Sequence, residues 1–126
     1  MSRASVEVGI GPVAPEQVVA VAREDAAVTI DPDALEAIQQ SRAAVERLAE
    51  ASVPAYGVST GFGALATKHI APELRTQLQK SLVRSHAAGS GPEVEREVVR
   101  GLMLLRLSTL ATGHTGALLD AGGLAD

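Results

Sequence analysis

The sequence predicts a mainly α-helical protein with one or two short strands near its N-terminus. Four prolines stand where apolar residues with helical spacing begin, and proline suits the first position of a helix because its backbone angle already fits there. These prolines are Pro15, Pro32, Pro72 and Pro92. Alternating apolar residues, which are typical of strands, occur only in short runs before residue 31. With 46% apolar residues but one tyrosine and one phenylalanine, the core is expected to be aliphatic.

One or two short strands and a helix are expected in the first thirty residues. Ser5–Ile10 and Ala26–Ile30 alternate weakly between apolar and other residues, as strands do. Between them, Pro15 begins a helix that ends at Arg23, and the valines and alanines of this segment supply its buried side. The chain therefore alternates between strand and helix before its long helices begin.

A longer helix is expected over Asp33–Ala51. The pair Asp31-Pro32 is a typical helix start, because an aspartate caps the first amide groups and proline fits the first turn. The larger apolar residues of this segment recur on one stripe, with charged residues on the other side. The stripe comprises Leu35, Ile38, Val45 and Leu48.

A glycine-rich loop follows, Ala55–Ala64, with the sequence A-Y-G-V-S-T-G-F-G-A. It contains the only tyrosine and the only phenylalanine of the chain, Tyr56 and Phe62. Glycine allows left-handed backbone angles and close approach of neighbouring groups, and it leaves a loop free to move. These residues alone leave two interpretations open: an ordinary turn with one aromatic side chain docked on the core, or a loop that carries a phenol into a cleft.

Two further helices are expected after the loop. The first begins at Pro72, repeats leucine every four residues and reaches His86 before the corner Gly89–Gly91. The second begins at Pro92, and the glutamates near its start suit the positive end of the helix dipole. Its middle, Val98–Ala111, is apolar on nearly every face. We therefore expect it to be buried all round, by a partner, another subunit or a missing remainder of the chain.

Composition and charge argue against several classes of function. A net charge of −4 is too mild to imply a nucleic-acid partner. The longest apolar run is interrupted by two arginines and is too short to span a membrane. The absence of cysteine favours a cytoplasmic location and excludes a thiolate nucleophile. The three histidines are too scattered for a helical metal-binding pair, so no metal site is expected.

Three weaker patterns have ordinary explanations. Gly61–Ala66 matches a relaxed dinucleotide-binding pattern, but no convincing strand precedes it and Pro72 interrupts the helix that should follow, so we reject that function. His86 taken alone is more often a packing residue than a functional one. Four basic residues between positions 68 and 84 are better explained as a solvated helix face than as an anion-binding rim. They are Lys68, Arg75, Lys80 and Arg84.

Two motifs taken together are more specific than any single pattern. Tyr56–Gly63 (Y-G-V-S-T-G-F-G) and Leu82–Gly89 (L-V-R-S-H-A-A-G) resemble the aromatic amino acid ammonia-lyase family, and within it the histidine ammonia-lyases. Met103–Leu107 and Gly113–Gly116 extend the similarity, which covers most of the chain, from about Ala14 onward.

The resemblance implies the N-terminal part of a helical fold in which four identical chains assemble and several subunits build each active site. Family members eliminate ammonia from an amino acid, and histidine gives urocanate in histidine catabolism. Their electrophile is a methylidene-imidazolone (MIO), formed autocatalytically from an internal Ala-Ser-Gly. Tyr56 corresponds to the loop tyrosine proposed as the base, and His86 to the histidine that positions the substrate or shuttles a proton. The other loop residues carried over are Gly57, Thr60, Gly61, Phe62 and Gly63.

The chain departs from the family pattern in two places. It lacks Ala-Ser-Gly, since Ala51-Ser52 is followed by valine and Gly89–Gly91 reads Gly-Ser-Gly. Its end, Gly113–Asp126, reads as frayed, and residues 117–126 diverge from the family. We therefore expect the 126 residues to form a single domain or fragment, the N-terminal region of such an enzyme. It would contain no cofactor of its own and would be inactive alone.

Two alternatives to that interpretation remain open. One is a free-standing helical interaction module derived from a lyase, which pairs with itself or with a larger lyase through Val98–Ala111. The other is a piece of a tyrosine or phenylalanine ammonia-lyase or aminomutase. Ser85-His86 resembles the histidine-specific members more, which favours a histidine-like substrate. The homo-oligomer formed through helices is what the family resemblance implies.

Overall fold

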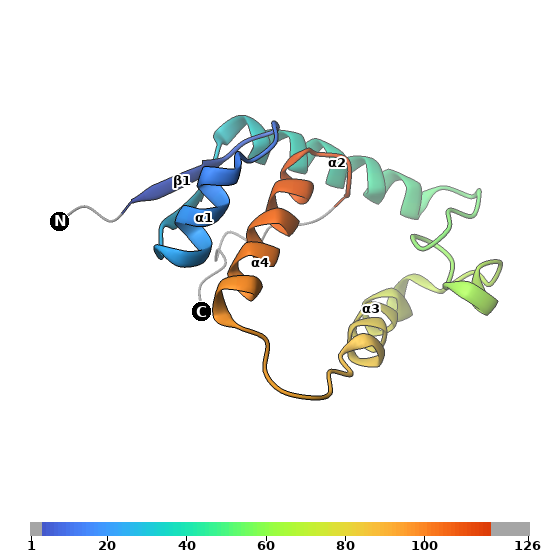
Figure 1. The fold of residues 1–126 in the computed structure, drawn as a ribbon. Coiled ribbons are helices and arrows are strands. Elements are labelled where there is room, and N and C mark those ends of the chain that lie inside the picture. The colour runs from blue at the N-terminus through green and yellow to red at the C-terminus, as the bar shows by residue number, and fades with distance from the viewer. Residues whose placement is uncertain (1–3, 117–126) are drawn as a thin grey trace. The chain divides into compact units, whose positions relative to one another are not determined.

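The computed structural model describes residues 4–116, which form two compact units (Figure 1). The first unit joins residues 4–43 to residues 93–116, and the second unit comprises Ala44–Pro92. Along these residues the chain forms two strands, four α-helices and one short 3₁₀ helix. The predicted fold class, mainly helical with short N-terminal strands, is therefore confirmed.

The two strands form a small parallel sheet in the first unit. β1 (Ser5–Val8) pairs with β2 (Ala27–Ile30), and the register places Val8 opposite Ile30. Parallel strands need a crossover between them, which α1 (Pro15–Arg23) supplies. Both strands are shorter than the sequence predicted, and the alternation of β1 is seen in its burial, since its valines are buried and its polar residues are exposed.

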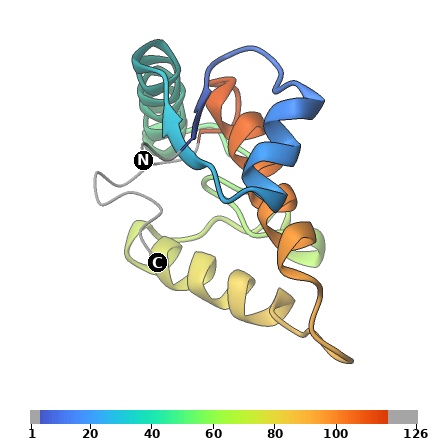
Figure 2. The ribbon, with the colours of Figure 1, turned by 60° about the vertical axis from the view of Figure 1, so that its left-hand side comes forward.

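The core of the first unit forms where α1 packs on α4 (Arg96–Ala111), two helices that lie side by side in Figures 1 and 2. The residues of α4 that reach this core recur every three or four positions, as one face of a helix requires. They are Gly101, Leu104, Leu107 and Ala111. Valines of β1 and α1 and two alanines complete a small aliphatic core.

The start of α4 differs from the prediction. The helix begins at Arg96 with Glu95 as its N-cap residue, four residues after Pro92. α1 and β1 cover one face of the helix and the opposite face is exposed, so the expected burial of every face by a partner, another subunit or a missing remainder stays a prediction. The exposed apolar side chains on α4 are Val98, Val99, Leu102, Met103 and Leu105, with exposed fractions of 40% to 66%. We call these five residues the outer face of α4.

The start of α2 (Pro32–Glu50) follows the sequence closely. Asp31 Oδ1 accepts a hydrogen bond from the Asp33 amide at 2.7 Å, as expected of a capping aspartate. Ala34 and Ile38 are its buried residues, whereas Leu35 is 38% and Leu48 49% exposed. The predicted helix is therefore confirmed, and its apolar stripe is buried only in part.

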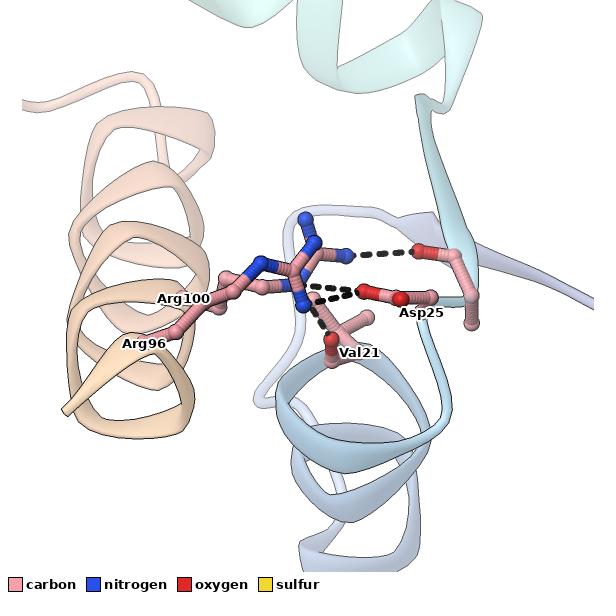
Figure 3. Close-up of polar contacts among 5 residues, drawn as sticks. Val21, Asp25, Arg96 and Arg100 are labelled. Atoms are coloured by element: carbon pink, nitrogen blue, oxygen red, sulfur yellow. Dashed lines mark hydrogen bonds and ion pairs between the residues drawn. The ribbon is translucent and has the colours of Figure 1, made fainter.

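Arg100 of α4 forms hydrogen bonds with the turn that joins α1 to β2 (Figure 3). Its Nε donates to the Val21 carbonyl at 2.7 Å and its Nη2 to the Ala26 carbonyl at 3.2 Å. Asp25, the turn residue with a φ of 57°, has Oδ1 3.5 Å from Arg100 Nε and 2.6 Å from Arg96 Nη1. One arginine therefore satisfies carbonyl groups at the end of α1 and before β2.

The segment after α4 returns to α2 within the first unit. Gly113 has a φ of +73°, and the Gly116 amide donates to Ser41 Oγ at 2.9 Å. The expectation of a frayed end is therefore wrong for residues 113–116, whereas the predicted divergent tail, 117–126, lies outside the described residues.

Gly113→Ala should lower the free energy of unfolding by about 2 kcal/mol, because a left-handed angle alone costs a residue with a Cβ about 1–2 kcal/mol. The added Cβ would also lie 2.9 Å from the Ala37 carbonyl oxygen. The midpoint of urea unfolding measures the change. Gly11→Ala is the matched control, since its Cβ would meet nothing within 4 Å. Equal midpoints for the two variants would contradict the predicted packing of this turn on α2.

Candidate functional site

Tyr56 lies in a hydrogen-bonded turn at the start of the glycine-rich loop of the second unit. The turn is closed by hydrogen bonds from the Val58 and Ser59 amides to the Ala55 carbonyl, at 3.1 and 3.0 Å. The Tyr56 side chain is 65% exposed. The phenol of Tyr56 is therefore accessible and not docked on a core, whereas Phe62 is half-buried, so the choice between the two interpretations of the loop stays a prediction.

The loop closes on itself through a short antiparallel contact. Thr60 pairs with His69 as an isolated bridge. The Gly61 amide donates to the Lys68 carbonyl at 3.1 Å, and the Ile70 amide donates to the Ser59 carbonyl at 2.9 Å. We call this pairing of residues 59–61 with residues 68–70 the loop base. The 3₁₀ helix η1 (Gly63–Leu65) lies in the segment between its two sides.

Glycine is needed at two positions of the loop for steric reasons. Gly57 has a φ of +69°, and a Cβ there would lie 2.8 Å from Phe62 Cε1. A Cβ on Gly61 would lie 2.5 Å from Leu65 Cβ. Because Gly57 has no side chain, Phe62 approaches Tyr56 edge-on, with ring centroids 5.9 Å apart and an interplanar angle of 85°.

Ser59 and Thr60 are the buried polar residues among positions 4–116, with exposed fractions of 0% and 2%. Ser59 Oγ accepts from the Ala55 amide at 2.9 Å, and Thr60 Oγ1 accepts from the Gly57 amide at 3.3 Å. Thr60 was predicted only as a member of the loop, and Ser59 was not predicted as a site residue. A hydroxyl residue in a glycine-rich loop was the only signal, and it does not tell which amide the hydroxyl will bind.

His86 is the last residue of α3 (Pro72–His86), and it is exposed. Its Nδ1 lies 2.9 Å from the Leu82 carbonyl oxygen and 3.1 Å from Ser85 Oγ. A carbonyl can only accept, so we assign the proton to Nδ1, which leaves Nε2 of the neutral ring as an acceptor. No hydrogen bond joins His86 to Tyr56 in the part of the chain that the structure describes.

The four basic residues near the loop do not behave alike. Arg75 is partly buried and structural, because its Nε donates to the Ile70 carbonyl at 3.1 Å and its Nη1 to the Ala49 carbonyl at 2.9 Å. Lys80 and Arg84 border an open depression on α3 together with Gln79 and Val83. The predicted solvated face therefore does not include Arg75, whose guanidinium holds the end of α2 near the start of α3 within the second unit.

The residues present do not fit the MIO group that the resemblance implies. The described segments nearest in composition to Ala-Ser-Gly are Ala51–Val53 and Gly89–Gly91, and both are exposed and irregular. Neither has the required tripeptide sequence.

Within residues 4–116 there is also no group of three histidine, aspartate or glutamate side chains that could hold a metal ion. No helix in the same range is long and apolar enough to cross a membrane.

Comparison with known proteins links this chain to one enzyme family. The family described as aromatic amino acid lyase matches residues 13–121. The histidine ammonia-lyase of Streptomyces griseus is 59% identical over 112 residues, which cover 89% of this chain and 22% of the relative. The histidine ammonia-lyase of Streptomyces avermitilis is 56% identical, also over 112 residues that cover 89% of this chain and 22% of the relative. The chain thus spans about a fifth of the length of these relatives.

Solved structures show the same local fold. An ergothionase from Treponema denticola superposes with a TM-score of 0.84 at 31% identity, over 89% of this chain and 22% of that one. A tyrosine aminomutase from Streptomyces globisporus superposes with a TM-score of 0.82 at 36% identity, over 90% of this chain and 22% of that chain. Histidine ammonia-lyase from Trypanosoma cruzi superposes with a TM-score of 0.81 at 29% identity, over 91% of this chain and 22% of that chain. On the extent of the family match and these likenesses, the chain belongs to the aromatic amino acid lyase family.

Proposed function

We propose that this chain is the N-terminal region of a histidine ammonia-lyase, a cytoplasmic enzyme of histidine catabolism that eliminates ammonia from L-histidine to give urocanate. The observation that carries this proposal is the 59% identity to the Streptomyces griseus enzyme over 89% of the chain. The solved tyrosine and phenylalanine aminomutases are 24% to 38% identical, which makes them the weaker candidates for the substrate.

The proposed role of Tyr56 is to take a proton from the carbon next to the one that bears the amine. That proton is very weakly acidic, so a base must be aimed at it in a water-poor site. The accessible phenol, on a loop fastened at its base, suits such a role. His86, with Nε2 free to accept, is proposed to position the substrate or relay a proton.

The rest of the site is proposed to come from protein outside these residues. An MIO group would supply the electrophile of the elimination, and this chain lacks the tripeptide that forms it. The outer face of α4 is proposed to be covered by other helices of the full-length homo-oligomer, because five exposed apolar side chains on one helix are typical of an interface. We therefore propose that the chain alone is inactive.

The outer face of α4 also favours a second candidate, a helical interaction module that pairs with itself or with a larger lyase. The oligomeric state of the purified chain distinguishes the two. A defined assembly that keeps its size on dilution supports the module, whereas a monomer or an aggregating species supports part of a longer enzyme. The substitution Leu102→Glu, on the outer face, should dissociate any such assembly without touching the core.

The proposed activity is tested by following urocanate formation from L-histidine by ultraviolet absorbance. The purified chain alone should form none. A fused enzyme, in which this chain replaces the matching 112 residues of the Streptomyces griseus lyase, should form urocanate and should prefer histidine to tyrosine and phenylalanine. Urocanate from the chain alone would refute its inactivity, and an inactive fused enzyme beside an active parent enzyme would refute the proposed function.

A further inference from the structure

We propose that Ser59 and Thr60 are positioning residues for Tyr56, and that their buried hydroxyls fix the backbone on both sides of the tyrosine. The catalytic consequence rests on the proposed function, whereas the ordering of Tyr56 does not. Nothing about the phenol itself provides such order, since its side chain is 65% exposed.

The two hydroxyls bind the two amides that flank Tyr56. Ser59 Oγ accepts from the Ala55 amide, and Thr60 Oγ1 accepts from the Gly57 amide while donating to the Gly61 carbonyl at 3.1 Å. Both side chains are buried almost completely. A buried hydrogen bond that loses one partner leaves the other group unsatisfied, which costs about 1–3 kcal/mol. The turn therefore depends on both hydroxyls for its shape.

The same two residues belong to the loop base through their main chains. The Ser59 carbonyl accepts from the Ile70 amide, and Thr60 pairs with His69. Ser59 thus bonds the tyrosine turn through its side chain and the loop base through its carbonyl, and Thr60 lies between the two residues whose backbones make the loop-base bonds. The direction in which the Tyr56 side chain leaves the backbone is consequently set by the loop base.

Contacts of the ring are too weak to set that direction by themselves. Tyr56 makes one aromatic contact, the edge-on approach of Phe62, and such pairs contribute about 0.5–1.5 kcal/mol. Catalysis requires finer positioning than this, since a misplacement of about 1 Å can lower a rate by about 10²-fold. The hydroxyl-bonded backbone is the part of the loop able to provide it.

The chain offers an unusually direct probe of this proposal. It contains one tyrosine and no tryptophan, so its intrinsic fluorescence reports Tyr56 alone. The test compares Thr60→Val, which keeps the shape of the side chain but removes the hydroxyl, with Thr60→Ser, which keeps the hydroxyl. Ser59→Ala is the second variant and removes the other bond, so the test does not depend on one substitution.

In the 126-residue chain, Thr60→Val should speed hydrogen exchange of the Gly57 amide by about tenfold and lower the fluorescence anisotropy of Tyr56. Thr60→Ser should restore both values. Ser59→Ala should likewise speed hydrogen exchange of the Ala55 amide by about tenfold. The Leu104 amide in the first unit serves as the internal control and should not change. Unaltered exchange and anisotropy would overturn the proposal, as would an equal acceleration at Leu104, which would indicate a general loss of stability.

In the fused enzyme, Thr60→Val should lower kcat by about tenfold or more with little change in KM, and Thr60→Ser should recover most of the rate. An active fused enzyme whose kcat is unaffected by Thr60→Val would overturn the positioning role. If the fused enzyme makes no urocanate at all, the proposed function fails, while the exchange and fluorescence measurements still decide whether the hydroxyls order Tyr56.

Discussion

Tyr56→Phe should lower urocanate formation by the fused enzyme by about 10²- to 10⁴-fold, the usual contribution of a positioned general base. The substitution removes only the phenol oxygen. The ring stays, and so does its edge-on contact with Phe62. Because the side chain is largely exposed, the loss of its hydroxyl should not affect folding. Initial rates with saturating L-histidine give the decrease in kcat.

Two controls separate the loss of the base from damage to the loop. Circular dichroism of Tyr56→Phe should match that of the parent, and exchange of the Gly57 amide, which Thr60 holds, should be unchanged. Gln77→Ala changes an exposed side chain in the middle of α3, so it should keep most of the activity. A Tyr56→Phe enzyme within about threefold of the parent rate would exclude the phenol as the base.

Arg100→Met should lower the free energy of unfolding by roughly 2 kcal/mol, allowing for the partial exposure of the guanidinium. The loss of the guanidinium leaves the Val21 and Ala26 carbonyls without its hydrogen bonds and removes its contact with Asp25, whereas the Arg96 contact with Asp25 remains. Methionine keeps most of the aliphatic stem, so the effect reports the lost hydrogen bonds more than lost packing. Urea unfolding followed by circular dichroism measures it.

Arg106→Met is the matched control, since Arg106 is an exposed arginine on the same helix. It should change the unfolding midpoint by less than about 0.5 kcal/mol in free energy. Added salt should weaken the Asp25 contacts, which are exposed, more than the bonds of Arg100 to carbonyl groups. Equal midpoints for the two variants would show that the turn after α1 holds without Arg100.

Helix starts were predicted from the sequence where the signal is local. Asp31 caps α2 through its own side chain, and the prolines at 15, 32 and 72 each stand at the first helical position. Pro92 carries the same signal, yet α4 begins at Arg96. The contacts of α4 with the turn after α1 begin at Arg96, so tertiary contacts and not the proline mark its first turn.

The candidate site was predicted less completely. Tyr56 and His86 came from the resemblance, and their roles stay predictions. Ser59 could not have been chosen from the sequence, because its importance lies in the amide that it binds four residues earlier. The exposure of Leu48 and of the outer face of α4 could not be predicted either, since periodicity tells which residues share a face but not whether anything packs against it.

The first unit is built from two segments that are separated in the sequence by the whole second unit, and this has a consequence for synthesis on the ribosome. Arg100 binds the carbonyl of Val21, 79 residues earlier, so the core that α1 and α4 share cannot close until the whole second unit has been translated. At about 5–20 residues per second, the first helix waits several seconds for its partner. The bonds of the tyrosine turn span only three or four residues, so this turn can order before the core of the first unit closes.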